Sequence, residues 1–399
     1  MNTEATFAPE AHLAVCRERR ERLLAHAQML GLQGFVVFGH GSSLGSGTRS
    51  HGALRYLTHW DGHDATSLLV CTKTACALLV GSPFLVPLAR LRHPDLVVID
   101  ASPATWGAHV KHLLGSARSV ATVGVDEMPQ AAWAGLQAAL APSCETRSMD
   151  SWLDGVRCEL DPVQQAAHRR AAGICDQLFG ALRQELRTGQ PAWRIQAEMA
   201  HRAHKLGADH CRTWLTVAPM ADYPRYWKEE CLRIPQANDQ VLFGVMLTVD
   251  GHWGHGIRMG HMGEPSAAIR CLHEAIEAAL VAGLKGLRCG SPLENVEAAM
   301  QSLLPARGAL ESTCFRYGHG LGHSYEEAHA TPCFPQWFGA ASSERQLSRT
   351  PTRPGMLLEL HPNVFLAGTG GAAIGEMVLV HENHNECLLD FPRSLADWS

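Results

Sequence analysis

The sequence predicts an α+β protein built from two domains, and three observations lead to that fold class. The chain has 399 residues, enough for two domains at roughly 150 residues each. Up to Arg157, short apolar segments alternate with helical stretches, which is typical of an α/β domain. From Asp161 onward, two long helical patterns precede long apolar strands. With 46% hydrophobic and 18% charged residues, both parts can bury a core.

The first part, residues 1–157, reads as a small α/β domain. Apolar positions at helical spacing predict a helix over residues 11–30, and a glycine-bounded apolar run predicts a buried strand over residues 34–39. Residues 41–52 are rich in glycine and serine and predict a loop. The remaining elements predicted here are strands at 53–57, 67–71, 75–80, 96–99 and 121–125, and helices at 104–114 and 131–140.

The second part, residues 158–399, begins with a clear helix signal. Asp161 is a good N-cap, and Pro162 occupies the first helical position, where proline is tolerated. The helix is predicted to run to about Arg187, where a Thr-Gly-Gln-Pro break follows. The later predictions are helices at 192–206, 266–283 and 293–304, and strands at 213–217, 240–249, 357–361 and 376–380.

Composition excludes several classes of function. Lysine and arginine number 34 and aspartate and glutamate 39. The net charge of −5 is not the basic charge excess expected of a nucleic-acid-binding protein. No apolar run approaches the twenty or so residues of a membrane span, and the N-terminus does not resemble a signal peptide. Thirteen scattered cysteines without a Cys-x-x-Cys pair predict reduced thiols in a cytoplasmic protein.

One stretch, residues 315–332, concentrates chemistry. It holds three histidines, two glutamates, two tyrosines and three glycines. Glycine allows close approach of the backbone to a ligand, and histidine is the commonest proton shuttle and metal ligand near neutral pH. The stretch therefore predicts a functional site, with a glycine-rich turn of solvent-facing histidines as the alternative.

Ordered motifs along the chain resemble one known family. The matching segments belong to the pita-bread proteins, which include creatinase, prolidase, aminopeptidase P and methionine aminopeptidase. The resemblance implies a C-terminal pita-bread domain at 158–399, preceded by a creatinase-type N-terminal α/β domain at 1–157. The segments that carry it are 161–206, 239–243, 251–258, 263–265, 318–322, 354–358 and 377–380.

The resemblance also implies an altered metal centre. Peptidases of the family hold two metal ions with two aspartates, a histidine and two glutamates. The matching positions here are Gly244, His255, His319, His361 and Gly375. Losing two carboxylates to glycine empties one ion site, while three imidazoles converge on the other. The expectation is one divalent transition metal per chain on His255, His319 and His361, zinc first, with iron, manganese or copper as alternatives.

The resemblance further suggests catalytic and substrate-binding residues. The catalytic candidates are Glu326 as a general base, His323, and Glu376 as a neighbour of the ion. The alternative without a functional role is a solvent-exposed side chain for Glu326 and His323, and a strand-edge carboxylate for Glu376. The substrate-binding candidates are Arg225, Tyr317 and His329, together with Tyr56 and Trp60 of the N-terminal domain, a region that family members use to cap the site, often from the partner subunit of a dimer.

The predicted function is hydrolysis of a C–N bond in a small polar compound, such as an amide, amidine, guanidino or cyclic compound, by a cytoplasmic homodimer. One alternative is metal-free, creatinase-like catalysis with His319 as the acid–base group. A second is redox chemistry on iron or copper, or a lyase reaction, on the same fold. A third is an Xaa-Pro peptidase or a catalytically inactive binding protein. A small-molecule substrate is expected, and neither nucleic acid nor membrane is an expected partner.

Overall fold

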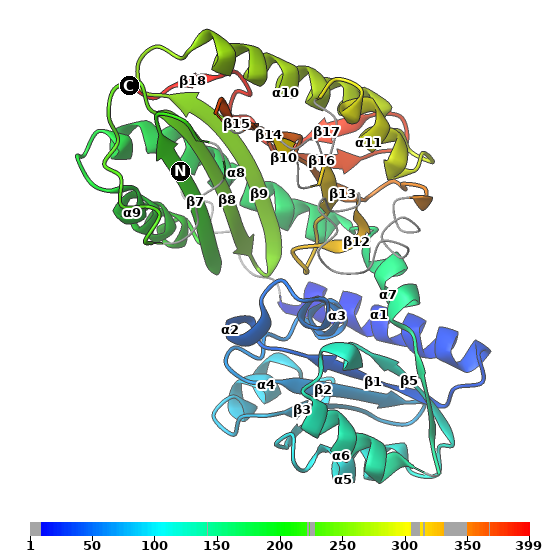
Figure 1. Cartoon of the computed structure of the whole chain (residues 1–399). Helices are drawn as coiled ribbons and strands as arrows, with labels where there is room; N and C mark the ends of the chain where they lie inside the picture. The colour runs from blue at the N-terminus through cyan, green and yellow to red at the C-terminus, as the bar shows by residue number, and fades with distance from the viewer. Residues whose placement is uncertain are drawn as a thin grey trace. The chain divides into compact units, whose positions relative to one another are not determined.

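The computed structural model describes residues 9–141, 143–221, 223, 228–304, 312–313, 316–330, 349–366 and 368–399. Its contacts divide the chain into two compact units (Figure 1). Unit 1 comprises Met1–Arg157 with His323–Tyr325, and unit 2 comprises Cys158–Gly322 with Glu326–Ser399. The mixed α and β content agrees with the predicted fold class. The predicted domain boundary after residue 157 stays a prediction.

Unit 1 is built on a six-stranded sheet in the order β4-β3-β2-β1-β5-β6. Strand β1, inside the sheet, pairs antiparallel with β2 and parallel with β5. Alternate residues of this strand enter two different cores, Phe35 and Val37 on one face and Val36 and Phe38 on the other. This is the period-two pattern of a strand buried on both faces. The strands are β1 (Gly34–Gly39), β2 (Ser67–Thr72), β3 (Cys76–Val80), β4 (Val97–Asp100), β5 (Ser119–Val123) and β6 (Glu145–Ser148).

Helices cover both faces of this sheet, and one of them corrects the sequence prediction. Residues 41–52 were expected to form a loop and 53–57 a strand, but α3 spans Arg49–Thr58. Thr48 is its N-cap and accepts a hydrogen bond from the His51 amide. A five-residue apolar run cannot distinguish a strand from a buried helix, and residues 50–58 are buried throughout. The other helices are α1 (Pro9–Met29), α2 (Ser42–Gly45), α4 (Val86–Arg92), α5 (Trp106–Leu114), the 3₁₀ turn η1 (Val125–Glu127), α6 (Gln130–Leu140) and α7 (Asp150–Arg157).

Three residues from far along the chain complete unit 1. Ser324 forms an isolated parallel bridge with Gly47, and the Tyr325 amide donates to the Gly47 carbonyl at 3.1 Å. The Arg157 guanidinium donates from Nη1 to Ser324 Oγ at 3.2 Å. Unit 1 therefore needs a segment that is separated from Arg157 by more than 160 residues of sequence.

The cysteines depart from the expectation of reduced thiols at one position. Cys71 and Cys76 face each other across the β2–β3 pair and form a disulfide. Nine other cysteines in the described part of the chain are free thiols. A cross-strand register cannot be deduced from cysteine spacing alone, which is why the pair was missed.

Unit 2 begins with two helices packed against a long sheet (Figure 1). Helix α8 (Pro162–Leu186) starts with a complete capping box, in which Asp161 accepts from the amides of Val163 and Gln164. Helix α9 (Ala192–Lys205) packs against α8 and the first strand. The sheet has the order β18-β9-β8-β7, from β7 (His210–Ala218), β8 (Gln240–Val249), β9 (His252–His261) and β18 (Ala396–Asp397).

A second sheet of unit 2 has the order β12-β11-β13-β16-β17. It approaches the first sheet where Ile257 of β9 bridges Gly375 just before β16. Helix α10 (Ala267–Gly286), with α11 (Leu293–Gln301) beside it, packs on a small third sheet that contains β15. The strands of these two sheets are β10 (Ser312–Thr313), β11 (Gly318–Gly320), β12 (Glu327–Ala330), β13 (Leu357–Leu360), β14 (Asn363–Leu366), β15 (Gly370–Ala373), β16 (Glu376–Val380) and β17 (Asn385–Cys387).

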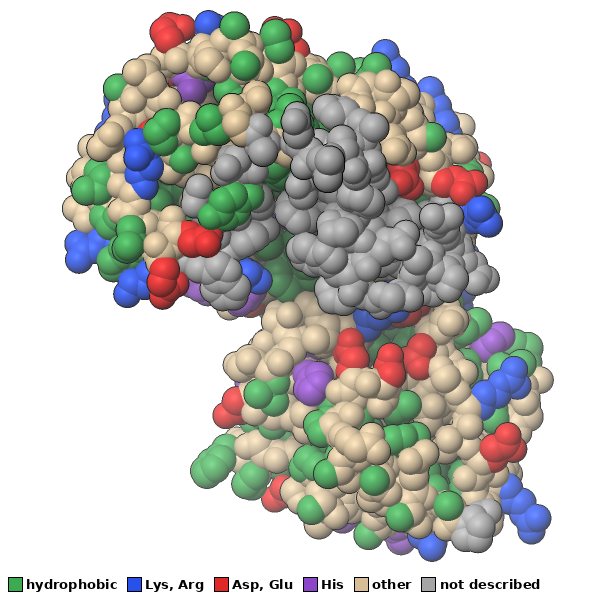
Figure 2. All heavy atoms as spheres, in the orientation of Figure 1, with side chains coloured by type: hydrophobic (Ala, Val, Ile, Leu, Met, Phe, Trp, Pro, Cys, Tyr) green, Lys and Arg blue, Asp and Glu red, His purple; other side chains and the backbone are tan. Residues whose placement is uncertain are grey.

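The surface carries both signs of charge. On the face that Figure 2 shows, basic and acidic side chains are intermixed among polar and apolar ones, in keeping with the small net charge. Among the helices that the structure describes, none combines the length and the apolar character needed to cross a bilayer.

Candidate metal centre

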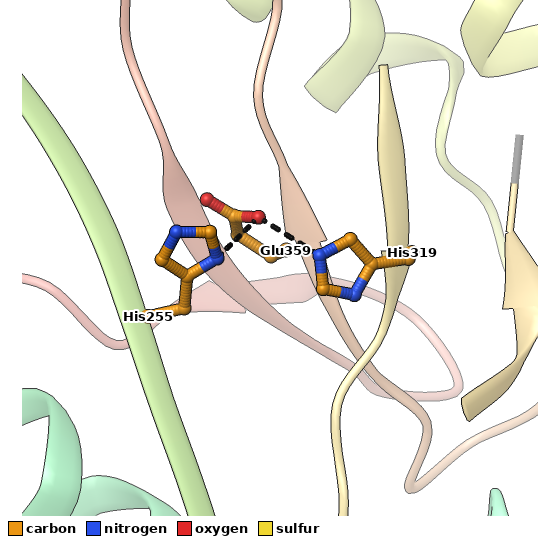
Figure 3. Close-up of side chains that lie close together, drawn as sticks. All are labelled: His255, His319 and Glu359. Atoms are coloured by element: carbon orange, nitrogen blue, oxygen red, sulfur yellow. Dashed lines mark ion pairs between the residues drawn. The ribbon is translucent and has the colours of Figure 1, made fainter. Parts of the chain in front are cut away.

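Three strands of unit 2 bring a carboxylate and three imidazoles together. His255 comes from β9, His319 from β11 and Glu359 from β13, and Figure 3 shows the two imidazoles facing one carboxylate oxygen. His319 and Glu359 are direct partners in the β11–β13 register. His361 follows β13, and its amide donates to the Tyr317 carbonyl at 2.9 Å, which continues the ladder. We call these four side chains the His–Glu cluster.

The cluster converges on one atom, Glu359 Oε2. This oxygen lies 2.7 Å from His255 Nδ1, 3.3 Å from His319 Nε2 and 3.4 Å from His361 Nε2. All four side chains are buried, and Glu359 has no exposed surface. Ligand atoms of His255, His319 and Glu359 lie within 4.8 Å of one another, a group that could hold a metal ion. His361 stands beside this group.

Burial and charge set the protonation states within the cluster. Burial by itself would raise the pKa of Glu359, but the facing imidazoles of His255 and His361 hold that pKa well below its usual range. Burial lowers the pKa of His361 to about 4, in spite of the carboxylate nearby. Burial also opposes a charge on His319, yet its contact with Glu359 raises the pKa of the imidazole. The cluster thus contains an ionised carboxylate surrounded by buried imidazoles.

The positions that match the lost carboxylates are closed to side chains. A Cβ on Gly244 would overlap the indole of Trp214, its direct partner across the β7–β8 pair. A Cβ on Gly375 would overlap Glu359 Oε1 and lie 2.8 Å from the Ile257 amide nitrogen. The residues present therefore do not fit a two-ion carboxylate centre, because an indole and a carboxylate take the space of two of its ligands.

The two glutamates among the predicted catalytic residues lie in different surroundings. Glu326 is 46% exposed at its side chain and pairs with Arg316 at 3.0 Å, on the segment that joins β11 to β12. It is close enough that its charge raises the pKa of His319. Glu376 is fully buried between two arginines, with Oε2 at 2.7 Å from Arg393 Nε and 3.5 Å from Arg258 Nη2.

Other predicted site residues are distributed over both units. His323 is buried in unit 1, with its ring centroid 6.5 Å from that of His59. Tyr56 and Trp60 are buried in the core of unit 1, which favours a packing role for them. Tyr317 is fully buried in unit 2, directly before β11. The described residues leave out Arg225 and the side chain of His329, so those two predictions lie outside them.

Glu359 is the member of the cluster that the sequence interpretation missed. The resemblance placed the family glutamate at position 361, so the histidine found there was predicted as the ligand and Glu359 was not. Residues two apart on a strand point to the same face, so the Glu-x-His pattern at the end of β13 was a usable signal. The role of Trp214 had no comparable signal, because only the strand register reveals that it faces Gly244.

Comparisons with known proteins agree with this architecture. Among solved structures, the prolidase from Pyrococcus horikoshii OT3 superposes with a TM-score of 0.78 at 14% identity, over 95% of this chain and 100% of that one. The X-Pro aminopeptidase from Thermotoga maritima MSB8 gives a TM-score of 0.75 at 17% identity, over 94% and 99%. At such identities the likeness concerns the fold, and it confirms the predicted pita-bread class.

Sequence comparison identifies the family. The probable dipeptidase PepE of Mycobacterium bovis is 26% identical over 156 residues, 38% of this chain and 38% of the relative. Alignments with the curated relatives span 38% to 41% of the length of those relatives. The sequence model of metallopeptidase family M24 matches residues 166–382, which is more than half of the chain. The chain therefore belongs to metallopeptidase family M24, a family of hydrolytic enzymes, as its motifs predicted.

Proposed function

We propose that this protein is a metal-dependent M24 hydrolase that cleaves a C–N bond of a small polar compound at the His–Glu cluster. The observation that supports this most is the convergence of His255, His319 and His361 on one carboxylate oxygen. Two of these histidines stand where the family has carboxylate ligands, so their convergence indicates a retained but altered centre. A bound divalent ion would polarise a carbonyl or amidine and lower the pKa of water to about 7.

The residues of the chain would then handle binding and protons. His361, whose pKa burial lowers to about 4, would stay neutral near neutral pH and present a lone pair to the ion or to the substrate. Glu326, which follows His319 by seven residues and pairs with Arg316 at 3.0 Å, stays the candidate general base. The burial of the cluster strengthens each of these interactions, because a water-poor site screens charge weakly.

The experiment is a turnover assay on a substrate panel with matched variants. The panel holds simple amides, amidines, guanidino acids, cyclic ureido compounds and Xaa-Pro dipeptides. We expect turnover of at least one class of compound. In His319→Ala, kcat/KM should fall roughly 100-fold or more, because removal of a direct metal ligand should reduce activity more than removal of a residue that only hydrogen-bonds a ligand. His381→Ala is the control, since His381 pairs with Glu386 away from the cluster and should keep full activity.

Two results would contradict the proposal. Equal turnover by wild type and His319→Ala would remove the cluster from the reaction. Full turnover by protein shown to lack metal would instead support acid–base catalysis by His319, whose pKa is already raised by Glu359. If Xaa-Pro dipeptides are the only compounds cleaved, the activity is that of a peptidase, as the names of the relatives suggest for those proteins.

A further inference from the structure

We propose that Glu359 is itself a metal ligand, in a set with His255 and His319, and that the centre holds one ion and excludes a second. This inference deepens the proposed function, since it names the donors and the ion count of the same site. It differs from the three-histidine set that the motifs suggested, because a carboxylate takes the third position. Two imidazoles with one carboxylate form a donor set known from both zinc hydrolases and mononuclear iron enzymes.

The first argument is the spacing of the donors. Ligands about 2.1 Å from one ion lie roughly 3 to 3.5 Å apart when they are adjacent. His319 Nε2 lies 3.3 Å from Glu359 Oε2 and His255 Nδ1 lies closer, at 2.7 Å, and the ligand atoms of all three residues lie within 4.8 Å of one another. His361 Nε2 lies 3.4 Å from the same oxygen but falls outside that group. Small movements could therefore place one ion among the three.

The second argument concerns where the proton of His319 resides. Its Nδ1 lies 3.1 Å from the Gly320 carbonyl oxygen, which can only accept, so Nδ1 carries the hydrogen. In the neutral ring, Nε2 then presents a lone pair towards the oxygen of Glu359. Two acceptors at 3.3 Å repel each other unless a cation or an added proton lies between them. A divalent ion satisfies both atoms at once.

The third argument is the state of the buried polar atoms. Oxygen Oε1 of Glu359 and Nε2 of His361 are buried and form no aligned hydrogen bond with any residue that the structure describes, whereas Oε2 of Glu359 lies 2.7 Å from His255 Nδ1. Buried carboxylates without hydrogen bonds are costly, whereas metal coordination compensates for their burial. Coordination of an ion by the Glu359 carboxylate would compensate for the burial of Oε1, which no donor among the described residues satisfies.

The fourth argument excludes a second ion. The Trp214 indole occupies the space beside Gly244, where the first family aspartate would project. The Oε1 atom of Glu359 occupies the space beside Gly375, where the bridging glutamate would project. The second ion would therefore lose both carboxylates and meet an apolar ring. A two-ion centre needs such bridging ligands, so the count falls to one.

The test is a titration of the metal-free full-length protein with Co(II). The readouts are the visible absorption of bound Co(II) and the ion count by plasma mass spectrometry, neither of which depends on turnover. We expect one Co(II) per chain in wild type and at least roughly tenfold weaker binding in Glu359→Gln. Glu359→Asp should keep binding but change the absorption spectrum, since the carboxylate is retained at a shorter reach. Glu386→Gln, a surface carboxylate paired with Arg169, is the matched control and should bind as wild type does.

His361→Ala separates the two possible donor sets. Binding that survives in His361→Ala and is weakened in Glu359→Gln supports the carboxylate set. The reverse pattern restores the three-histidine set and overturns the inference, as would two ions per chain in wild type. Circular dichroism of each variant identifies a folding defect. If Glu359→Gln does not fold, a changed Co(II) absorption spectrum in Glu359→Asp supports ligation by Glu359, and an unchanged spectrum contradicts it. Absence of turnover on every compound, with one ion bound, would instead overturn only the proposed function.

Discussion

At the scale of residues, the centre shows what spacing can and cannot reveal. The resemblance to the family motifs was enough to select His255, His319 and His361, and the structure places all three around one oxygen. Their assignment as metal ligands stays a prediction. Spacing could not reveal Trp214, because its position opposite Gly244 depends on strand pairing between residues thirty apart. It also missed the arginine partners of Glu376, which come from two separate segments.

Gly375 offers a test at this scale. In Gly375→Ala, the added methyl group would overlap the Glu359 carboxylate and crowd the Ile257 amide nitrogen. Overpacking of this kind costs about 1 to 3 kcal/mol, and displacement of Glu359 should weaken metal binding at least roughly tenfold. The measurements are thermal unfolding and the Co(II) titration.

The control for that substitution is Gly180→Ala in helix α8, where an added Cβ meets nothing within 4 Å. Alanine is favoured over glycine inside a helix, so this variant should be unchanged or slightly more stable. If Gly375→Ala binds metal as tightly as Gly180→Ala does, the carboxylate of Glu359 does not need its present position.

At the scale of elements, prediction succeeded where local chemistry decides the outcome. Asp161 and Pro162 marked the start of α8 because capping and proline geometry act within one turn. The strand at 240–249 was recovered with its bounds, since a long apolar run is unambiguous. Helix α3 was mistaken for a loop and a strand because its burial comes from tertiary packing, and α4 left no clear periodic pattern in its seven residues.

The cap of α8 gives the prediction for this scale. Asp161 accepts from Val163 N at 2.9 Å and from Gln164 N at 3.0 Å, and the Gln164 side chain returns to the Asp161 amide at 3.3 Å. Asp161→Ala should lower the free energy of unfolding by about 1 kcal/mol, measured as a shift in the urea midpoint. Glu382→Ala removes an exposed carboxylate of the same unit and should leave the midpoint unchanged. Equal effects of both changes would argue that charge, and not capping, is responsible.

At the scale of the whole molecule, the division into units decides how stability responds to solution conditions. Unit 1 holds three histidines, two buried and one half-buried, whose charged form is disfavoured. Burial, assisted by Arg55, lowers the pKa of His51 to about 4 and that of His59 to about 2. Burial likewise lowers the pKa of His93 to about 4, although Asp95 acts in the opposite direction. All three are neutral in the folded protein at neutral pH.

These histidines predict acid sensitivity of unit 1. The unfolded chain binds protons at these sites below about pH 6.5, whereas the folded chain resists until about pH 4 or lower. Stability is therefore fully present above pH 6.5 and falls as the pH decreases, by up to about 1.4 kcal/mol per pH unit for each histidine. Urea unfolding between pH 7.5 and 4.5 measures the slope.

A variant of His51 tests whether this histidine contributes to the pH dependence of the stability. The His51 ring donates from Nδ1 to the His40 carbonyl at 2.8 Å, and His51→Gln keeps a donor without the titration. Its slope should be shallower than that of wild type by the share of one histidine. His109→Gln, the same exchange at a half-buried histidine on helix α5, is the control and should leave the slope unchanged. An unaltered slope in His51→Gln would remove that histidine from the explanation.

The three residues His323–Tyr325 have a consequence for how such a protein can change over generations. Because they complete unit 1, the chain enters that unit twice, once from its beginning and once between β11 and β12. A single recombination event at residue 157 would exchange only part of unit 1 and leave Arg157 and Gly47 without Ser324. A donor sequence would have to supply compatible residues at both places. The two parts of this chain are thus constrained to diverge together, and the segment between His319 and Glu359 carries part of that constraint.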